Sequence, residues 1–346
     1  MSYIKPIYIK KYNIYDIFYN ETSLIIIQPF KTVDNIFFDN ISMEIITDSN
    51  IYIYTILCSN QQPIITLVID DEEIITNVNK YNTFPNEIIM STIVKNEDKY
   101  IIMWINYCMK LGVKRFIIYD NSVNNTLLDI LYSYIIQNIV VLIKWGYSYY
   151  TYYNMNKKIT GQITQQNHSL YVFKSSKYIG LFDIDEYINP QYNYILVDDV
   201  FNDIIKEKKI NKDLIGGFKI YQKSFYNSTM RNDFLNIYEC DNIDLIGREK
   251  MFIIPKNVDI VSVHIIIQGK EIYTVTPDIM YFNHYMYLNK LYRNRIIFSP
   301  KLKDDSIYYL LKRMNLNINN ITDNCYKINN NTLFIILFIY IILNSV

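Results

Sequence analysis

Two aspartates one residue apart, Asp183 and Asp185, are the residues whose types and spacing most directly suggest chemistry. They follow the apolar run 178–182, whose aromatic and β-branched residues predict a strand buried on both faces. Side chains two residues apart on an extended backbone point the same way, so both carboxylates could hold one hard divalent cation while Ile184 turns to the core. Taken alone, an Asp-x-Asp sequence more often marks a solvated acidic turn.

The elements around this strand must position the two carboxylates. Between residues 87 and 300 the sequence alternates between strand-like and helix-like segments joined by short links. This alternation predicts an α/β domain with a mostly parallel sheet and helices on both faces. The predicted strands are 88–94, 114–119, 139–144 and 178–182, and the predicted helices are 98–111, 126–136 and 159–174.

The N-terminal part of the chain has a different pattern. Residues 1–86 predict a small β-rich module, because strand-like runs at 51–57, 64–69 and 73–78 are separated by turn-forming residues. The first twenty residues mix Lys, Tyr and Asp without an apolar core, so no signal peptide is expected there. A cytoplasmic or peripherally membrane-associated protein is the corresponding expectation.

The C-terminal segment, residues 301–346, raises the question of a membrane. It predicts an amphipathic helix at 301–313 and a polar linker at 315–331, followed by an apolar run at 333–343. That run is shorter than the roughly 20 residues that span a bilayer. It either docks on the core as a last strand or helix, or it forms a weak membrane-associating tail.

Length and charge limit the domain organisation and the kinds of partner that the sequence suggests. The chain has 346 residues, which suits two domains or one large domain with an appendage. Its 34 basic and 34 acidic residues balance, so its overall charge does not indicate a nucleic-acid partner.

Polar residues at the predicted strand ends would share one rim of the sheet, where ligands of open α/β sheets bind. This rim has the chemistry that a nucleotide-sugar needs. Asp120 can accept hydrogen bonds from a base or ribose, and a metal held by Asp183 and Asp185 can neutralise a diphosphate and assist its departure. No Gly-rich loop follows the first strand, so a diphosphate would be bound through Mn²⁺ or Mg²⁺ rather than by a backbone cradle.

Several short blocks between residues 92 and 189, in order and in spacing, resemble the pattern of glycosyltransferase family 92, which belongs with the family 2-like enzymes of GT-A fold. The matching blocks are 94–97, 104–113, 116–122, 161–162, 167–168 and 182–187. A fainter continuation includes 248–250, Pro255, His264 and 283–285.

The resemblance implies a role for each matching residue. The implied contacts to the nucleotide-sugar are Asn96, Glu97, Asp120, Gln162, Asn167 and Asp183. The implied metal ligands are Asp183, Asp185 and a late histidine, for which His284 is the first choice and His264 the second. A histidine among apolar residues is otherwise more often a hydrogen-bonded core residue.

The resemblance also implies inversion at the anomeric carbon, which requires a carboxylate base to take the proton of the acceptor hydroxyl. The available carboxylates are Asp233, Glu239, Asp241, Asp244 and Glu249. We select Glu249 because it lies in the fainter matching block; an ordinary surface charge is the alternative for each. The tyrosine-rich segment 147–153 could stack on sugar rings, or it could be a mobile surface loop.

These observations predict a metal-dependent glycosyltransferase that moves a sugar from a nucleotide donor, in the first instance a UDP-sugar, to a hydroxyl of a glycan or glycoconjugate. Two alternatives remain open. A nucleotidyltransferase shares the paired aspartates but usually carries a Gly-rich and basic loop that this sequence lacks. A glycan-binding or scaffolding protein that has lost catalysis is the alternative from another class.

Overall fold

The predicted strands pair in parallel at the centre of a large sheet in the computed structural model, which describes residues 3–48, 50–96, 98–153, 156–225, 239–240, 248–285 and 302–316. Strand β11 (Ile88–Val94) pairs with β12 (Arg115–Asp120) on one side and with β16 (Tyr178–Leu181) on the other, and β13 (Val140–Lys144) pairs with β12. Their residues are almost all buried, as expected of strands covered on both faces. The predicted α/β fold is confirmed.

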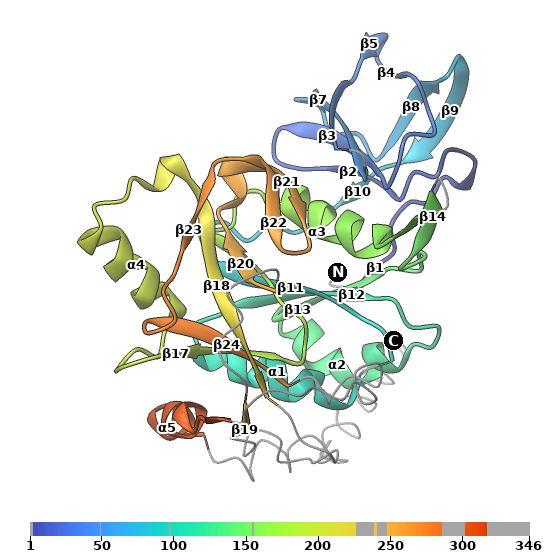
Figure 1. Cartoon of the computed structure of the whole chain (residues 1–346). Coiled ribbons are helices and arrows are strands. Elements are labelled where there is room, and N and C mark those ends of the chain that lie inside the picture. The colour runs from blue at the N-terminus through green and yellow to red at the C-terminus, as the bar shows by residue number, and fades with distance from the viewer. Residues whose placement is uncertain are drawn as a thin grey trace, which may run out of the picture.

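Helices cover both faces of these strands, as Figure 1 shows. Helices α1 (Asp98–Lys110) and α2 (Thr126–Ile136) pack on one face together with α4 (Val197–Glu207), and α3 (Thr160–Val172) packs on the other. Alternate residues of each strand supply the two cores: Met90 of β11 faces the first and its neighbour Ile89 the second.

Beyond β16 the sheet becomes mixed, which the local sequence pattern did not predict. Strand β20 (Lys250–Ile253) runs antiparallel to β16, and β18 (Ile215–Phe225) runs antiparallel to β20. Strand β24 (Met280–Tyr285) then pairs in parallel with β18 and antiparallel with β17 (Glu186–Pro190). This arrangement brings β17, which directly follows the Asp-x-Asp sequence, against a strand almost a hundred positions later in the chain: Glu186 is the register partner of His284.

Shorter elements complete this part of the chain. The further strands are β14 (Thr151–Tyr153), β15 (Asn156–Lys158), β19 (Glu239–Cys240), β21 (Val258–Ser262), β22 (Ile265–Gly269), β23 (Glu271–Thr274) and β25 (Leu302–Lys303). Short 3₁₀ turns lie at Lys10–Tyr12, Lys212–Leu214 and Pro255–Asn257. Helix α5 (Ser306–Arg313) begins later than the predicted helix 301–313, because β25 occupies the start of that segment.

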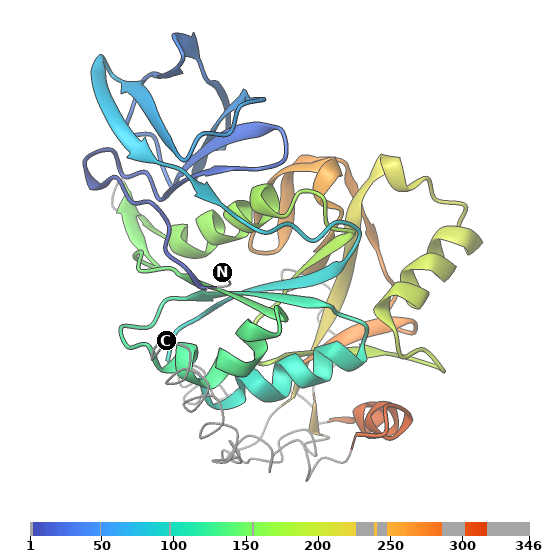
Figure 2. The ribbon, with the colours of Figure 1, turned by 180° about the vertical axis from the view of Figure 1, so that it is seen from behind.

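The predicted N-terminal β-rich module is present and lies over α3 in both views (Figures 1 and 2). Two small sheets enclose its core. One contains β2 (Asp16–Tyr19), β3 (Ser23–Gln28), β6 (Glu44–Asp48), β7 (Ile51–Leu57) and β10 (Asn79–Lys80), and the other contains β4 (Ile36–Phe38), β5 (Ile41–Ser42), β8 (Ile64–Ile69) and β9 (Glu72–Asn77). The first strand, β1 (Tyr3–Ile4), instead pairs with β13 at the edge of the large sheet. The chain therefore starts in the large sheet and only then enters the module.

A buried hydrogen-bond network joins the module to α3. The carboxylate of Asp16 accepts hydrogen bonds from the hydroxyl of Tyr81, from His168 at 2.9 Å and from the backbone N–H groups of Ile7 and Ile17 at 2.8 Å. The other ring nitrogen of His168 accepts from the hydroxyl of Tyr119 at 2.8 Å, because Nε2 carries the proton donated to Asp16. This network lets a fully buried carboxylate sit at the junction.

At the C-terminal end, α5 packs on β17 through Ile307 and Leu310. The apolar run 333–343 and the linker 315–331, apart from its first two residues, lie outside the described residues. Among the helices of the described ranges, none is long and apolar enough to cross a membrane.

Candidate functional site

Asp183 and Asp185 lie in the tight turn that connects β16 to β17. The backbone N–H of Glu186 donates to the carbonyl of Asp183 at 3.1 Å, and the N–H of Asp183 donates to Oε2 of Glu186 at 2.9 Å. We predicted that the two aspartates point the same way because we expected an extended backbone between them. The structure has a turn there instead. Ile184 packs into the core, as predicted.

The strand that leads into this turn needs a glycine. A Cβ atom on Gly180 would lie 2.4 Å from Sδ of Met90 and 2.8 Å from Cε1 of Phe252, both of which belong to the flanking strands. A side chain at this position would therefore have to displace the side chains of Met90 and Phe252, which pack over the glycine. The position of the acidic turn is thus fixed by packing on both sides.

Asp183 forms an ion pair with Lys250, the first residue of β20. The ammonium of Lys250 lies 2.7 Å from Oδ2 of Asp183 and 3.0 Å from Oε2 of Glu186. Desolvation by the surrounding protein raises the pKa of Asp183, but the ammonium of Lys250 outweighs it and the pKa is lowered overall. Lys250 is buried, whereas 42% of the Asp183 side chain is exposed, so the carboxylate keeps an open side.

A group of three buried side chains lies beside this pair. Ligand atoms of Asp185, Glu186 and His284 all lie within 4.8 Å of one another, and Nε2 of His284 is 3.4 Å from Oδ2 of Asp185. Burial lowers the pKa of His284, but the carboxylate of Asp185 outweighs it and the pKa is raised overall. Burial raises the pKa of Glu186 to about 7.

A second layer of hydrogen bonds orients His284. The amide nitrogen of Gln222 donates to Oγ of Ser224 at 2.7 Å, so its amide oxygen faces Nδ1 of His284 at 2.9 Å. Because an amide oxygen only accepts, Nδ1 carries the proton and Nε2 is the ring atom presented to Asp185. Metal-binding histidines are usually held in this way.

The cluster differs from the predicted ligand set in one residue. We expected Asp183, Asp185 and His284; the three-residue group contains Glu186 in place of Asp183, whose carboxylate is paired with Lys250. Glu186 follows Asp185 directly in the sequence and could have been considered. Lys250 belongs to the fainter matching block 248–250, but its pairing with Asp183 and Glu186 was not predicted, because these partners lie more than sixty positions earlier.

The sequence profile of glycosyltransferase family 92 matches residues 88–329, well over half of the chain and the part that contains this cluster. The chain belongs to glycosyltransferase family 92. A comparison with the curated proteins found no match.

Part of this family 92 enzyme is similar in structure to TarS from S. aureus. The crystal structure of its residues 1–349 aligns with a TM-score of 0.36 at 11% identity, over 57% of this chain and 60% of that one. The same fragment in complex with UDP aligns with a TM-score of 0.29 at 16% identity, over 44% of this chain and 40% of that one. A further structure of TarS aligns with a TM-score of 0.36 at 13% identity, over 60% of this chain and 38% of that one. The chain thus spans less than two thirds of the length of these structures.

Asn96 and Asp120, two of the residues predicted to contact the nucleotide-sugar, lie at the ends of β11 and β12 and are linked through Ser122. The carboxylate of Asp120 accepts from Lys144 at 2.8 Å and from the backbone N–H of Ser122 at 2.9 Å. Oγ of Ser122 accepts from the N–H of Asn96 at 2.9 Å. The adjacent Glu97 lies outside the described residues.

The two residues predicted on α3 have different surroundings. The amide nitrogen of Gln162 lies 3.5 Å from Oδ1 of Asp183, and its amide oxygen accepts from the hydroxyl of Tyr149 at 2.7 Å. Asn167 instead exchanges hydrogen bonds with the backbone of Val261 in β21, at 2.8 and 3.0 Å. Gln162 therefore borders the acidic turn, whereas Asn167 fastens α3 to β21.

The remaining candidates lie near the start of β20. The carboxylate of Glu249 is 3.5 Å from the ammonium of Lys219, and its backbone carbonyl accepts from Nδ1 of His264 at 2.7 Å. Burial and the ammonium of Lys250 lower the pKa of His264, which is not in the three-residue group. Of the other carboxylates considered as bases, Asp233, Asp241, Asp244 and the side chain of Glu239 lie outside the described residues.

Proposed function

We propose that this family 92 glycosyltransferase transfers a sugar from a nucleotide-sugar, in the first instance a UDP-sugar, to a hydroxyl of a glycan or glycoconjugate, with inversion and with the help of a divalent cation. One observation carries the proposal. Asp185 of the turn after β16, Glu186 at the start of β17 and His284 of β24 form a buried group of oxygen and nitrogen ligands, at the rim where open α/β sheets bind ligands.

The side chains present suit Mn²⁺ or Mg²⁺. Asp183, Asp185 and Glu186 bring three carboxyl groups against two basic groups, the ammonium of Lys250 and the imidazole of His284, so acidic groups are in excess. Carboxylate oxygens and an imidazole nitrogen are ligands that these cations accept. When bound by Asp185, Glu186 and His284, the cation would neutralise the diphosphate of the donor and favour its departure.

Lys250 and Asp183 act beside these ligands. The buried ammonium supplies a fixed positive charge near the place where the leaving diphosphate gains negative charge, which favours the transition state over the ground state. Oδ1 of Asp183 lies 3.5 Å from the amide nitrogen of Gln162, and we assign this pair to the nucleotide-sugar. Asp120 and Asn96 are assigned to the base or ribose, since they lie together at the neighbouring strand ends.

Glu249 remains our proposed base. Its carboxylate is mostly buried, is paired with Lys219 and precedes Lys250 in the chain. In an inverting reaction such a group takes the proton of the acceptor hydroxyl while the oxygen attacks the anomeric carbon on the face opposite the diphosphate. Replacement by Gln would remove this proton acceptor and preserve the size of the side chain.

Release of free UDP from a panel of UDP-sugars, measured with and without Mn²⁺, tests the proposed function. The wild-type protein should release UDP only with the cation, and Asp185→Asn should lower the rate by about 100-fold, since a ligand is lost. The control is Asp71→Asn in the β-module, where φ is 69° and Asn is readily accepted. Equal rates in the Asp185→Asn and Asp71→Asn proteins would refute the assignment.

A further inference from the structure

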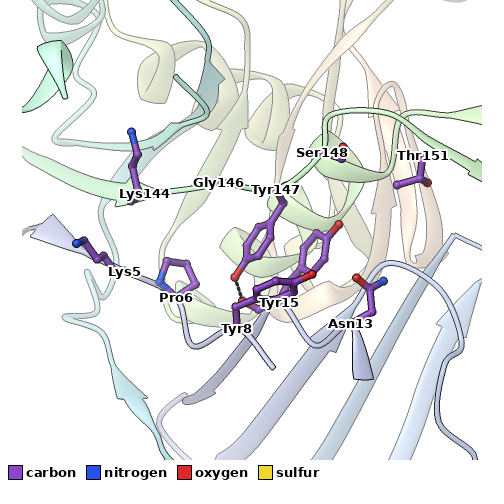
Figure 3. A pocket seen from close by; sticks show the side chains of 10 residues that line it. All are labelled: Lys5, Pro6, Tyr8, Asn13, Tyr15, Lys144, Gly146, Tyr147, Ser148 and Thr151. Carbon is purple, nitrogen blue, oxygen red and sulfur yellow. Dashed lines mark hydrogen bonds between the residues drawn. The ribbon is translucent and has the colours of Figure 1, made fainter. Parts of the chain in front are cut away.

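A pocket of about 500 Å³ lies between two segments of the chain, the N-terminal segment 5–15 and the segment 144–151 that leads from β13 to β14. Figure 3 shows side chains from both segments around it, with Lys5, Tyr8 and Asn13 from the first and Tyr147 from the second. None of the functions assigned above uses this pocket. Its lining residues include two lysines and no carboxylate.

Of these two lysines, Lys144 is paired with a carboxylate, whereas Lys5 has no such partner among the described residues. The ammonium of Lys144 donates three hydrogen bonds, to Asp120 at 2.8 Å and to the carbonyls of Ser122 and Asn124 at 2.8 and 2.9 Å, so all its protons are used. Lys5 forms no ion pair with any of the described residues. The pocket therefore presents one unmatched positive charge.

The pocket also has unused hydrogen-bond donors. The amide nitrogen of Asn13 is buried and has no hydrogen-bond partner among the described residues. The hydroxyls of Tyr8 and Tyr15 make no hydrogen bond within the described part of the chain. A ligand rich in acceptor oxygens would satisfy these groups together.

Aromatic rings form a rigid wall of the pocket. The rings of Tyr15 and Tyr147 stack with centroids 3.8 Å apart, and the hydroxyl of Tyr147 donates to the backbone carbonyl of Tyr15. Tyr8 packs edge-on against Tyr147 at 5.1 Å and is 47% exposed, so part of its ring is open. Rings with an apolar face and a polar tip suit a ligand that has both apolar C–H groups and hydroxyls.

The wall of the pocket continues to the acidic turn. The side-chain amide of Asn121, next to Asp120, donates to the carbonyls of Trp145 and Tyr147, which fixes the segment on the rim of the sheet. Two residues further, Tyr149 contacts Gln162, whose amide nitrogen borders Asp183. A molecule in the pocket thus lies beside the same segment that borders the proposed donor site.

We propose that the pocket binds an anionic saccharide unit, a sugar ring that bears a phosphate or a carboxylate, as a distal part of the acceptor glycan. The unmatched ammonium of Lys5 recognises the anionic group, the donors of Asn13 and Tyr15 recognise ring oxygens, and the exposed ring of Tyr8 covers the C–H face. That the saccharide belongs to the acceptor rests on the proposed function; its binding to the pocket does not.

Calorimetric titration of the full chain tests the proposal, with glucose 6-phosphate and glucuronate as probes, and glucose, inorganic phosphate and UMP for comparison. At least one charged sugar should bind, at least tenfold more tightly than glucose or phosphate, and the tighter probe identifies the anionic group. Lys5→Gln and Tyr8→Ala should each weaken this binding at least tenfold. Lys10→Gln, on an exposed lysine of the same segment that does not line the pocket, should leave it unchanged.

Repeating the titration with Asp185→Asn separates this proposal from the proposed function. Binding that persists in this variant and depends on Lys5 and Tyr8 supports the pocket assignment whether or not the enzyme turns over a nucleotide-sugar. Three results would overturn it: neither charged sugar binds, the binding is unchanged by both Lys5→Gln and Tyr8→Ala, or UMP displaces the bound sugar.

Discussion

Lys250 and Asp183 are joined by an ion pair of 2.7 Å in which the lysine is buried and the aspartate is partly open to solvent. Because the same ammonium also lies 3.0 Å from the buried carboxyl of Glu186, it ties together the two ends of the turn that carries the acidic residues. The turn is therefore held by a residue of β20, on a strand that the chain reaches only after α4 and β18. The remaining carboxyl, that of Asp185, is left to pair with His284.

Removing the charge of Lys250 should destabilise the protein. Lys250→Met preserves the length of the side chain but leaves the buried Glu186 without its cation, and breaking a buried pair costs about 3 kcal/mol or more in the free energy of unfolding. Urea denaturation measures this loss. Lys256→Met is the matched control, because Lys256 pairs with Asp213 at 2.6 Å but both side chains are mostly exposed, so the expected loss is much smaller than in Lys250→Met. Equal losses in the two variants would contradict the structural role of Lys250.

Removing the hydrogen bond that orients His284 should weaken metal binding. Gln222→Leu deletes the acceptor of the Nδ1 proton at a buried position, and the loss of such outer contacts typically costs 10–100-fold in affinity. Titration with Mn²⁺ in the absence of nucleotide measures the affinity directly. Gln137→Leu on exposed Gln137 after α2 is the control. An unchanged Mn²⁺ affinity in Gln222→Leu would indicate that His284 is not a ligand.

The junction between the β-module and the large sheet should depend on the charge of Asp16. Asp16→Asn replaces an accepting oxygen by an N–H₂ group that faces donors, so buried hydrogen bonds are lost and the free energy of unfolding should fall by about 3 kcal/mol. Chemical denaturation followed by Tyr and Trp fluorescence measures this. Asp39→Asn, at an exposed position with a φ of 51°, should change stability by less than about 0.5 kcal/mol. A neutral Asp16→Asn would show that the network is dispensable.

Stability contributed by Asp304 should disappear in acid. Burial raises the pKa of Asp304, but hydrogen bonds from Lys223, Ser306 and Tyr281 outweigh it and lower the pKa below the ordinary value of 3.8. A carboxyl with a lowered pKa contributes stability that is fully present above its unfolded pKa and is lost as the pH falls through its folded pKa. The difference in unfolding free energy between wild type and Asp304→Asn should therefore be large at pH 6 and shrink as the pH is taken below 3.8. A difference that does not change with pH would contradict the assignment.

The sequence predicted those features of the structure that depend on neighbouring residues, and it did not predict contacts between residues far apart in the chain. The observed limits of β11 and α2 agree with the predicted ranges 88–94 and 126–136, because runs of apolar residues and their helical spacing are properties of consecutive positions. The pairing of Glu186 with His284 is set by strands far apart in the chain, and no local pattern reports such a register. For the same reason the sequence indicated the acidic turn but not that Lys250 would bind Asp183.

The central claim is that the acidic turn after β16 binds a cation that in turn binds a diphosphate. Thermal unfolding of the protein with UDP, with Mn²⁺ and with both together tests it most directly, because a ligand that binds only the folded state raises the melting temperature. At saturating concentrations, about 100 times the dissociation constant, the pair should stabilise the wild type by about 2.7 kcal/mol, and Asp185→Asn should abolish the gain. Stabilisation by UDP that is equally large in EDTA, or that survives in Asp185→Asn, would contradict the claim.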